Sequence, residues 1–211
     1  MKQLKLIFLA VLLFLTSCSN TKITSSWKAD DAQKNNYNKI IVFGIFNQKD
    51  RSIRDNVETQ LVSQLHSLGY NAVSALAEYG PKAFAKLKEE DVAAQLKSSG
   101  YDAVLTTVLL DKSKEKDYNP GNVSYQPVGY RYNRFGRYYT TVYDRVYEPG
   151  YYTTSTQYFL ESNLYDLNST DLKYSVQSKA FDPSSTSELA ANYSKRIVKD
   201  LKEKGILMKK N

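Results

Sequence analysis

Few residues in this chain of 211 amino acids could carry catalytic or metal-binding chemistry. The chain has one cysteine, Cys18, and one histidine, His66. A single cysteine excludes an intramolecular disulfide and a multi-cysteine metal site, and a single histidine excludes paired-histidine metal motifs. None of the nine glycines stands in the Gly-x-Gly spacing of a nucleotide-binding loop, and no GxSxG motif presents a nucleophilic serine. We therefore expect no metal, no cofactor and no enzymatic activity.

One segment is unusually rich in tyrosine and arginine. Residues 118–152 contain ten of the 18 tyrosines, together with four arginines. Aromatic rings and guanidinium groups bind stacked bases, sugar rings, phosphate groups and proteins. If residues 138–147 form a strand, the period of two places one set of side chains on one face. That set includes Tyr139, Tyr143, Arg145 and Tyr147.

We expect this face to be a partner-binding surface, assisted by Arg131, Arg134 and Arg137 near the turn that precedes it. The partner chemistry that fits is an envelope protein, a glycan or a lipid headgroup. The alternative is an edge hairpin whose tyrosines pack on a sheet, or a tyrosine-rich loop with no ligand.

The N-terminus has the pattern of an export signal. Lys2 and Lys5 precede the apolar run Leu6–Leu15, which is shorter than the about 20 residues that span a bilayer and is typical of a signal peptide. The residues Leu15–Cys18 resemble the lipobox of bacterial lipoproteins, whose cysteine is acylated and becomes the mature N-terminus. The alternative is an ordinary signal peptide with an incidental cysteine. The resemblance implies a signal peptide over residues 1–17 and a lipid, such as palmitate, on Cys18.

The same resemblance implies a location. No aspartate follows Cys18, and no acidic cluster occurs in the next residues. Lipoproteins of this kind sit in the outer membrane and face the periplasm. The export signal also argues against a nucleic-acid partner, although the net charge is +7.

The stretch after the cysteine is polar. We expect residues 18–38 to form a lipidated tether. Trp27 is its one large aromatic side chain, and we expect its ring to be buried against the domain. The alternative is that Trp27 contacts a ligand.

Three apolar runs in the first half predict buried strands. Residues 40–46 and 103–110 are rich in β-branched and aromatic residues, and residues 70–75 form a shorter run. Helical patterns separate these runs, so the order is strand, helix, strand, helix, strand. This order implies parallel pairing through right-handed crossovers.

The two intervening helices have recognisable ends. Asp50 can cap the first helix and Gly69 can end it. Acids at Glu89–Asp91 suit the first turn of the second helix, and Gly100 ends that helix. The apolar stripe of the first helix consists of Ile53, Val57, Leu61, Leu65 and Leu68.

The second half predicts an antiparallel meander followed by a helix. Turn residues separate strands at 138–147, 152–167 and 172–181. Ser185 and Glu188 form a capping-box pattern at the start of the last helix. Its apolar face consists of Leu189, Tyr193, Ile197 and Leu201.

The sequence therefore predicts an α/β fold with α+β character in its C-terminal half. We expect one domain over residues 39–207, with a mixed sheet and a tyrosine- and arginine-rich insertion at residues 111–154.

With these elements placed, the chain resembles Gram-negative periplasmic lipoproteins of unknown function. Their small α/β domain is similar to the TolB N-terminal domain and to CsgG-like proteins. The resemblance rests on Ser25–Trp27, Lys39–Phe46, Gly100–Leu105, Leu164–Leu167 and Lys204–Leu207. It implies a fold and a compartment, and it carries over no catalytic residue.

Two functions remain open from the sequence. The first is a lipid-anchored, non-catalytic binding or assembly module of the cell envelope. The alternative is a hydrolase of envelope polymers that uses carboxylates which no motif marks.

Overall fold

The computed structural model describes residues 20–32, 37–82, 84, 88–119, 122–133 and 138–210, and for residues 122–133 and 138–148 it describes the backbone. The chain divides into two compact units. The first unit comprises the chain up to Ser113 and from Gln157 onward, and the second is Lys114–Thr156.

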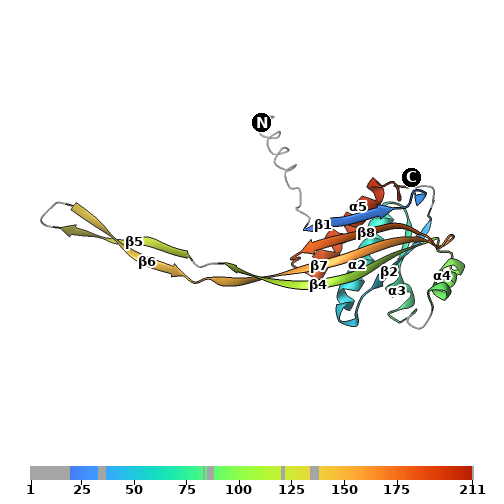
Figure 1. The fold of residues 1–211 in the computed structure, drawn as a ribbon, viewed down its shortest axis with the longest axis horizontal. Coiled ribbons are helices and arrows are strands. Elements are labelled where there is room, and N and C mark those ends of the chain that lie inside the picture. The colour runs from blue at the N-terminus through green and yellow to red at the C-terminus, as the bar shows by residue number, and fades with distance from the viewer. Residues whose placement is uncertain are drawn as a thin grey trace, which may run out of the picture. The chain divides into compact units, whose positions relative to one another are not determined.

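The first unit is built on a mixed sheet of six strands in the order β1-β8-β7-β4-β2-β3 (Figure 1). β2, next to the edge strand β3, is parallel to β3 and β4, whereas β8 is antiparallel to both β1 and β7. This confirms the predicted mixed α/β fold. The strands are β1 (Thr21–Lys28), β2 (Lys39–Ile45), β3 (Asn71–Ser74), β4 (Ala103–Asn119), β7 (Tyr151–Asp166) and β8 (Leu172–Phe181).

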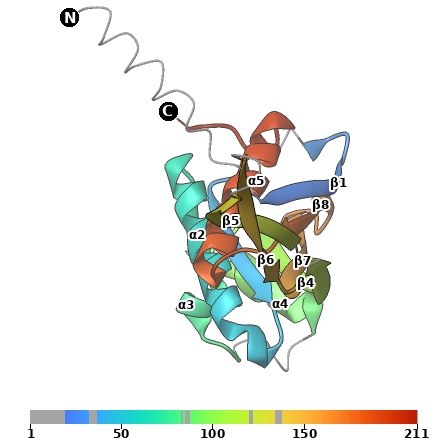
Figure 2. The ribbon, with the colours of Figure 1, turned by 90° about the vertical axis from the view of Figure 1, so that its left-hand side faces the viewer.

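One face of this sheet is covered by two long helices. α2 (Arg51–Ser67) and α5 (Thr186–Glu203) lie side by side (Figure 2). Their predicted apolar stripes are buried against sheet residues such as Ile40, Leu105 and Leu160, so both helix predictions are confirmed. Burying side chains of this size stabilises the fold by roughly 1.5–3 kcal/mol each.

The other face is covered by helices only over the parallel strands. α3 (Ala75–Tyr79) and α4 (Glu89–Ser98) pack over Ile41 and Val104, which belong to the parallel strands β2 and β4. Within the described residues, no helix covers this face over β7, β8 and β1. On this face Trp27, Gln177 and Phe181 are exposed, whereas Gln157 and Asn163 of β7 are buried among their neighbours.

The helix ends differ in part from the predicted caps. Ser185 accepts a hydrogen bond at its Oγ from the Glu188 amide, as predicted, but the Glu188 carboxylate accepts from Ser184 rather than from Ser185. Asp50 stands at the N-cap of α2 without a side-chain capping bond, because a 3₁₀ turn (Gln48–Asp50) precedes the helix.

The segment expected to be a tether contains the strand β1. It forms the edge of the sheet through antiparallel pairing with β8, from Thr21 opposite Ala180 to Lys28 opposite Tyr174. The prediction that Trp27 is buried is wrong, because its side chain is 50% exposed. Backbone pairing with β8 and a hydrogen bond from Ser26 to Asp200 hold this segment on the domain, and no buried tryptophan ring contributes.

The second unit contains a two-stranded antiparallel sheet of β5 (Asn122–Asn133) and β6 (Tyr138–Glu148). The predicted strand at 138–147 therefore exists, but it pairs with β5 and is not part of the predicted meander. The sequence analysis predicts no strand over residues 122–133, so it lacks the partner that the structure gives to this strand.

Candidate functional site

A row of side-chain positions crosses the open face of the six-stranded sheet. Trp27 of β1 lies opposite Ser175 of β8, which lies opposite Asn163 of β7. The Oγ1 hydroxyl of Thr106 in β4 donates a hydrogen bond to the Asn163 carbonyl at 3.3 Å. Thr106 lies opposite Phe43 of β2 in the sheet. The row therefore runs from an exposed tryptophan at the sheet edge to an aromatic residue beneath α4.

The row leads into an apolar groove of about 750 Å³. Phe43, Val104 and Val108 form its floor on the sheet, and Val92 and Leu96 of α4 form a wall. Ile45 lies at the groove and is 48% exposed. A large apolar lining with few polar groups is typical of a binding site.

Phe84 closes the groove on the side of the α3–α4 segment. Its ring lies 5.6 Å from the ring of Phe43 in an edge-to-face arrangement and 5.1 Å from the ring of Tyr79. Aromatic pairs in this geometry contribute about 0.5–1.5 kcal/mol beyond their buried area, so this wall is held by specific contacts.

Asn163 supplies an unused hydrogen-bond acceptor at the groove. The residue is only 9% exposed, and its Nδ2 donates to Glu161 Oε1 at 2.9 Å. Glu161 Oε2 accepts from Gln177 Nε2 at 2.8 Å, so the amide orientation of Asn163 is fixed. Asn163 Oδ1 has no hydrogen-bond partner. A buried acceptor without a donor costs about 1–3 kcal/mol.

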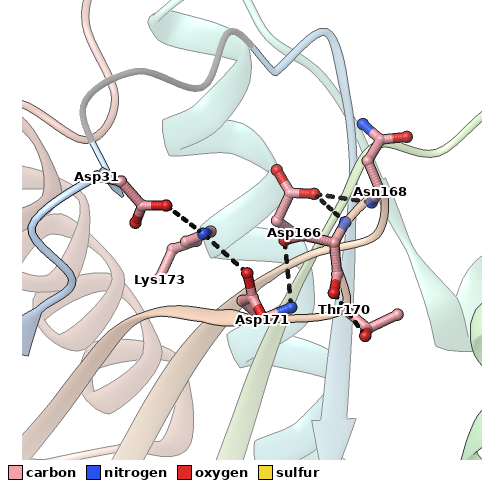
Figure 3. Close-up of polar contacts among 7 residues, drawn as sticks. Asp31, Asp166, Asn168, Thr170, Asp171 and Lys173 are labelled. Carbon is pink, nitrogen blue, oxygen red and sulfur yellow. Dashed lines mark hydrogen bonds and ion pairs between the residues drawn. The ribbon is translucent and has the colours of Figure 1, made fainter.

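The polar turn between β7 and β8, drawn in Figure 3, contributes Asp166 and Thr170 to the lining of the groove. Asp166 Oδ1 accepts hydrogen bonds from the amides of Asn168 and Ser169 at 2.7 and 2.9 Å. The Asp166 amide donates to the Asp171 carbonyl at 3.0 Å. These bonds shape the turn, so this carboxylate is structural.

Lys173 joins the turn to the segment that follows β1. Its buried ammonium donates to Asp31 Oδ2 at 2.8 Å and to Asp171 Oδ2 at 3.1 Å (Figure 3). The hydrogen bond from Lys173 lowers the pKa of Asp31. Bonds from Ser169 and Lys173 lower the pKa of Asp171, and the two carboxylates raise the pKa of Lys173. The cluster is a structural ion pair at the sheet edge.

A further carboxylate, Glu58, is buried and already occupied. Glu58 is fully buried and accepts from Gly44 N at 2.9 Å, Arg54 Nε at 2.8 Å, Leu76 N and Ser74 Oγ. Because donors surround both oxygens, this side chain holds α2, β2 and α3 together and has no free position for a substrate.

No metal centre emerges from the part of the chain that the structure describes. Within it, no group of three or more histidine, cysteine, aspartate or glutamate side chains could hold a metal ion. Among the same residues, none of the helices combines the length and the apolar character needed to cross a membrane.

The residues predicted as functional fall in two groups. Cys18, Arg134 and Arg137 lie outside the described residues. The backbone register of β5 and β6 places the rest: Tyr139 opposite Tyr132, Tyr143 opposite Pro127, Arg145 opposite Tyr125, Tyr147 opposite Val123 and Arg131 opposite Thr140.

This register places tyrosines of β5 opposite residues of the predicted face. Directly opposed residues of an antiparallel pair share a face. Tyr125, Tyr130 and Tyr132 of β5 occupy register positions opposite Arg145, Thr141 and Tyr139. Arg131 pairs with Thr140, and its role beside the tyrosine face stays a prediction.

The sequence reasoning missed the groove and Asn163. A signal was present in β7, where Gln157, Glu161 and Asn163 recur at every second position with Phe159 and Tyr165. This alternation predicts a face that is not core, but the position of α4 beside it depends on the tertiary structure.

Comparison with known proteins shows only distant similarity. No family model matches the sequence, and no curated protein matches it. Similar solved structures include a PelC dodecamer from Paraburkholderia phytofirmans (12% identity, 90% of this chain and 98% of that chain, TM-score 0.41). Lipoprotein GNA1162 from Neisseria meningitidis is similar at 14% identity, with 79% and 99% coverage and a TM-score of 0.41.

A neuraminyllactose-binding hemagglutinin homolog from Helicobacter pylori is similar at 13% identity, with 82% and 89% coverage and a TM-score of 0.39. At these values the similarities assign no family and no function to this chain. The resemblance to the TolB N-terminal domain and to CsgG-like proteins stays a prediction.

Proposed function

We propose that this protein is a lipid-anchored, non-catalytic binding module of the bacterial cell envelope, held in the outer membrane and facing the periplasm. Its partner is an envelope protein that inserts an apolar segment into the groove between α4 and the sheet. The observation that carries this proposal is the apolar groove with the unpartnered Asn163 Oδ1.

The lining of the groove favours a polypeptide as the ligand. Its apolar floor can hold aliphatic side chains, and a backbone N–H of the same segment can donate to Asn163 Oδ1. Binding then removes the desolvation cost of this acceptor.

Exposed large side chains lie at the groove and beyond it on the same face. Trp27 is 50% exposed and Ile45 is 48% exposed on the same face of the sheet. Large aromatic and apolar residues of this kind often dominate the binding energy of protein interfaces. The lipid on Cys18 would keep the surface at the membrane, where envelope partners are concentrated.

The experiment places a photo-cross-linking residue at position 45 or, as a control, at the exposed position 191 on α5. The full-length protein is cross-linked in its native envelope, and the joined peptides are mapped by mass spectrometry. We expect position 45 to cross-link to an apolar peptide of one partner and position 191 not to do so. Equal cross-linking at both positions, or none at position 45, would overturn the proposal.

A matched pair of substitutions tests the groove directly. Ile45→Glu introduces a charge at the groove, whereas Ala191→Glu introduces the same side chain on the helical face. We expect partner recovery to fall at least about tenfold for Ile45→Glu only, with thermal unfolding unchanged in both. Full recovery with a folded Ile45→Glu variant would contradict a role for the groove.

A further inference from the structure

The folded domain begins almost directly after the predicted lipid attachment site. Asn20 is two residues beyond Cys18, and its carbonyl accepts a hydrogen bond from the Phe181 amide at 3.1 Å. Thr21 already pairs with Ala180. Two residues span at most about 7 Å, so the end of the sheet that contains Phe181 must lie close to any lipid on Cys18.

This end of the open face carries a basic and aromatic patch. Lys22 of β1 lies directly opposite Lys179 of β8, which lies directly opposite Phe159 of β7. The Lys179 ammonium stands 5.4 Å from the centre of the Phe159 ring. Phe181, two residues along β8, is 46% exposed. We call Lys22, Phe159, Lys179 and Phe181 the anchor-end patch.

The charges of the two opposed lysines do not stabilise the sheet. Like charges that are directly opposed on neighbouring strands destabilise a sheet. Within the described part of the chain, neither Lys22 nor Lys179 forms a salt bridge with a carboxylate. An exposed phenylalanine beside two such lysines is a pattern that favours an amphipathic, anionic surface.

The charge balance of the patch supports this reading. Asp182, which follows Phe181, is the nearest acid along β8, and Glu161 on the same face is held by the amides of Asn163 and Gln177. The four residues of the anchor-end patch themselves carry two positive charges and no acid. Each lysine close to an anionic leaflet strengthens attachment by several-fold at physiological salt.

We propose that the anchor-end patch docks the domain onto the anionic surface of the bilayer that holds the Cys18 lipid. The ammonium groups of Lys22 and Lys179 bind lipid phosphates, and the Phe181 ring lies at the headgroup boundary. This inference rests on the lipid attachment in the proposed function. It also adds an orientation, because the groove lies toward the other end of the same strands.

The test uses the lipidated protein in phosphatidylcholine vesicles with or without phosphatidylglycerol. Because the only native cysteine is acylated, an introduced cysteine can carry a fluorophore at one position. Lys112→Cys labels the anchor end of β4, and Glu203→Cys labels the end of α5, where the side chain is 53% exposed. Nitroxide groups on the lipid headgroups report proximity by quenching.

We expect strong quenching at position 112 and weak quenching at position 203 in phosphatidylglycerol vesicles. Lys22→Glu with Lys179→Glu should reduce quenching at position 112 to the level at position 203, and high salt should do the same. The control pair Lys195→Glu and Lys199→Glu on α5 makes the same change in net charge and should have no effect.

The possible failures can be told apart. An unmodified Cys18 in the intact mass would remove the lipid anchor of the proposed function. If Cys18 is lipidated but quenching at position 112 changes neither with the lysine substitutions nor with phosphatidylglycerol, only the docking is overturned. Thermal unfolding of each variant shows that its fold is intact.

Discussion

Ser26 in the first strand donates a hydrogen bond from its Oγ to Asp200 Oδ2 in the last helix at 2.6 Å. Tyr174 Oη of β8 donates to the same oxygen at 2.8 Å. Burial and the neighbouring Asp200 carboxylate raise the pKa of the Tyr174 hydroxyl, so it stays protonated and remains a donor. This shared acceptor fixes β1 and β8 to α5 near the centre of β1.

The first prediction concerns Asp200, which is 8% exposed. Asp200→Ala removes the acceptor of two hydrogen bonds and leaves the fully buried Tyr174 hydroxyl without this partner. We expect the free energy of unfolding to fall by about 2–4 kcal/mol in urea denaturation. Ser26→Ala loses one part-buried bond and should cost only about 1 kcal/mol. Equal losses for the two variants would contradict the shared-acceptor role.

The second prediction concerns the buried Glu58. Glu58→Ala leaves Arg54 and the Gly44 and Leu76 amides without their acceptor, and we expect a loss of about 3–5 kcal/mol in the free energy of unfolding. Glu203→Ala is the control, because its 3.6 Å ion pair with Lys199 is exposed and should be worth less than about 1 kcal/mol. A small effect at Glu58 would mean that these groups find other partners.

The third prediction concerns pH. The pKa values of Asp31 and Asp171 are lowered in the folded protein, below the ordinary value of about 3.9. Their contribution to stability is therefore present above about pH 4 and is lost as the pH falls through the folded pKa values. Lys173→Met should raise both pKa values and flatten the decline of stability below pH 4.

The measurement is the denaturation midpoint as a function of pH, with the carboxyl resonances of Asp31 and Asp171 followed by NMR. Lys195→Met, on the exposed side of α5, is the control and should leave both titrations unchanged. If stability falls equally steeply below pH 4 in the wild type and in Lys173→Met, the cluster contributes nothing to the loss of stability in acid.

The fourth prediction concerns the tyrosine face of β5 and β6. Replacing Tyr143 and Arg145 by alanine should weaken partner binding about tenfold or more if this face is a second interface, with the thermal midpoint changed little. Thr140→Ala, at a register position of the opposite face, is the control. Lost stability would indicate a packing role, and unchanged binding would indicate that this hairpin binds no partner.

Much of the first unit was predictable because its signals are local. Apolar residues at spacings of three and four placed α2 and α5, since a helix must bury one continuous stripe. Continuous apolar runs placed β2 and the start of β4, because strands covered on both faces have no polar side. The Cys18 lipidation site is likewise a local pattern, and it stays a prediction.

The strands with weak local signals were decided by pairing. The polar stretch Thr21–Lys28 becomes a strand because β8 offers its free edge, and only this pairing puts Trp27 on the open face. β6 contains the residues predicted for it, but its partner β5 depends on a register that no local pattern states.

The candidate site was the feature that could least be predicted from the sequence. Asn163, Phe43 and Val92 come from a strand, a neighbouring strand and a helix that are far apart along the chain, so no spacing connects them. The sequence alone determined which residues are apolar or polar and which periods they follow. Tertiary structure decided which face α4 leaves uncovered and that Asn163 Oδ1 would lack a donor, because both depend on how the elements pack.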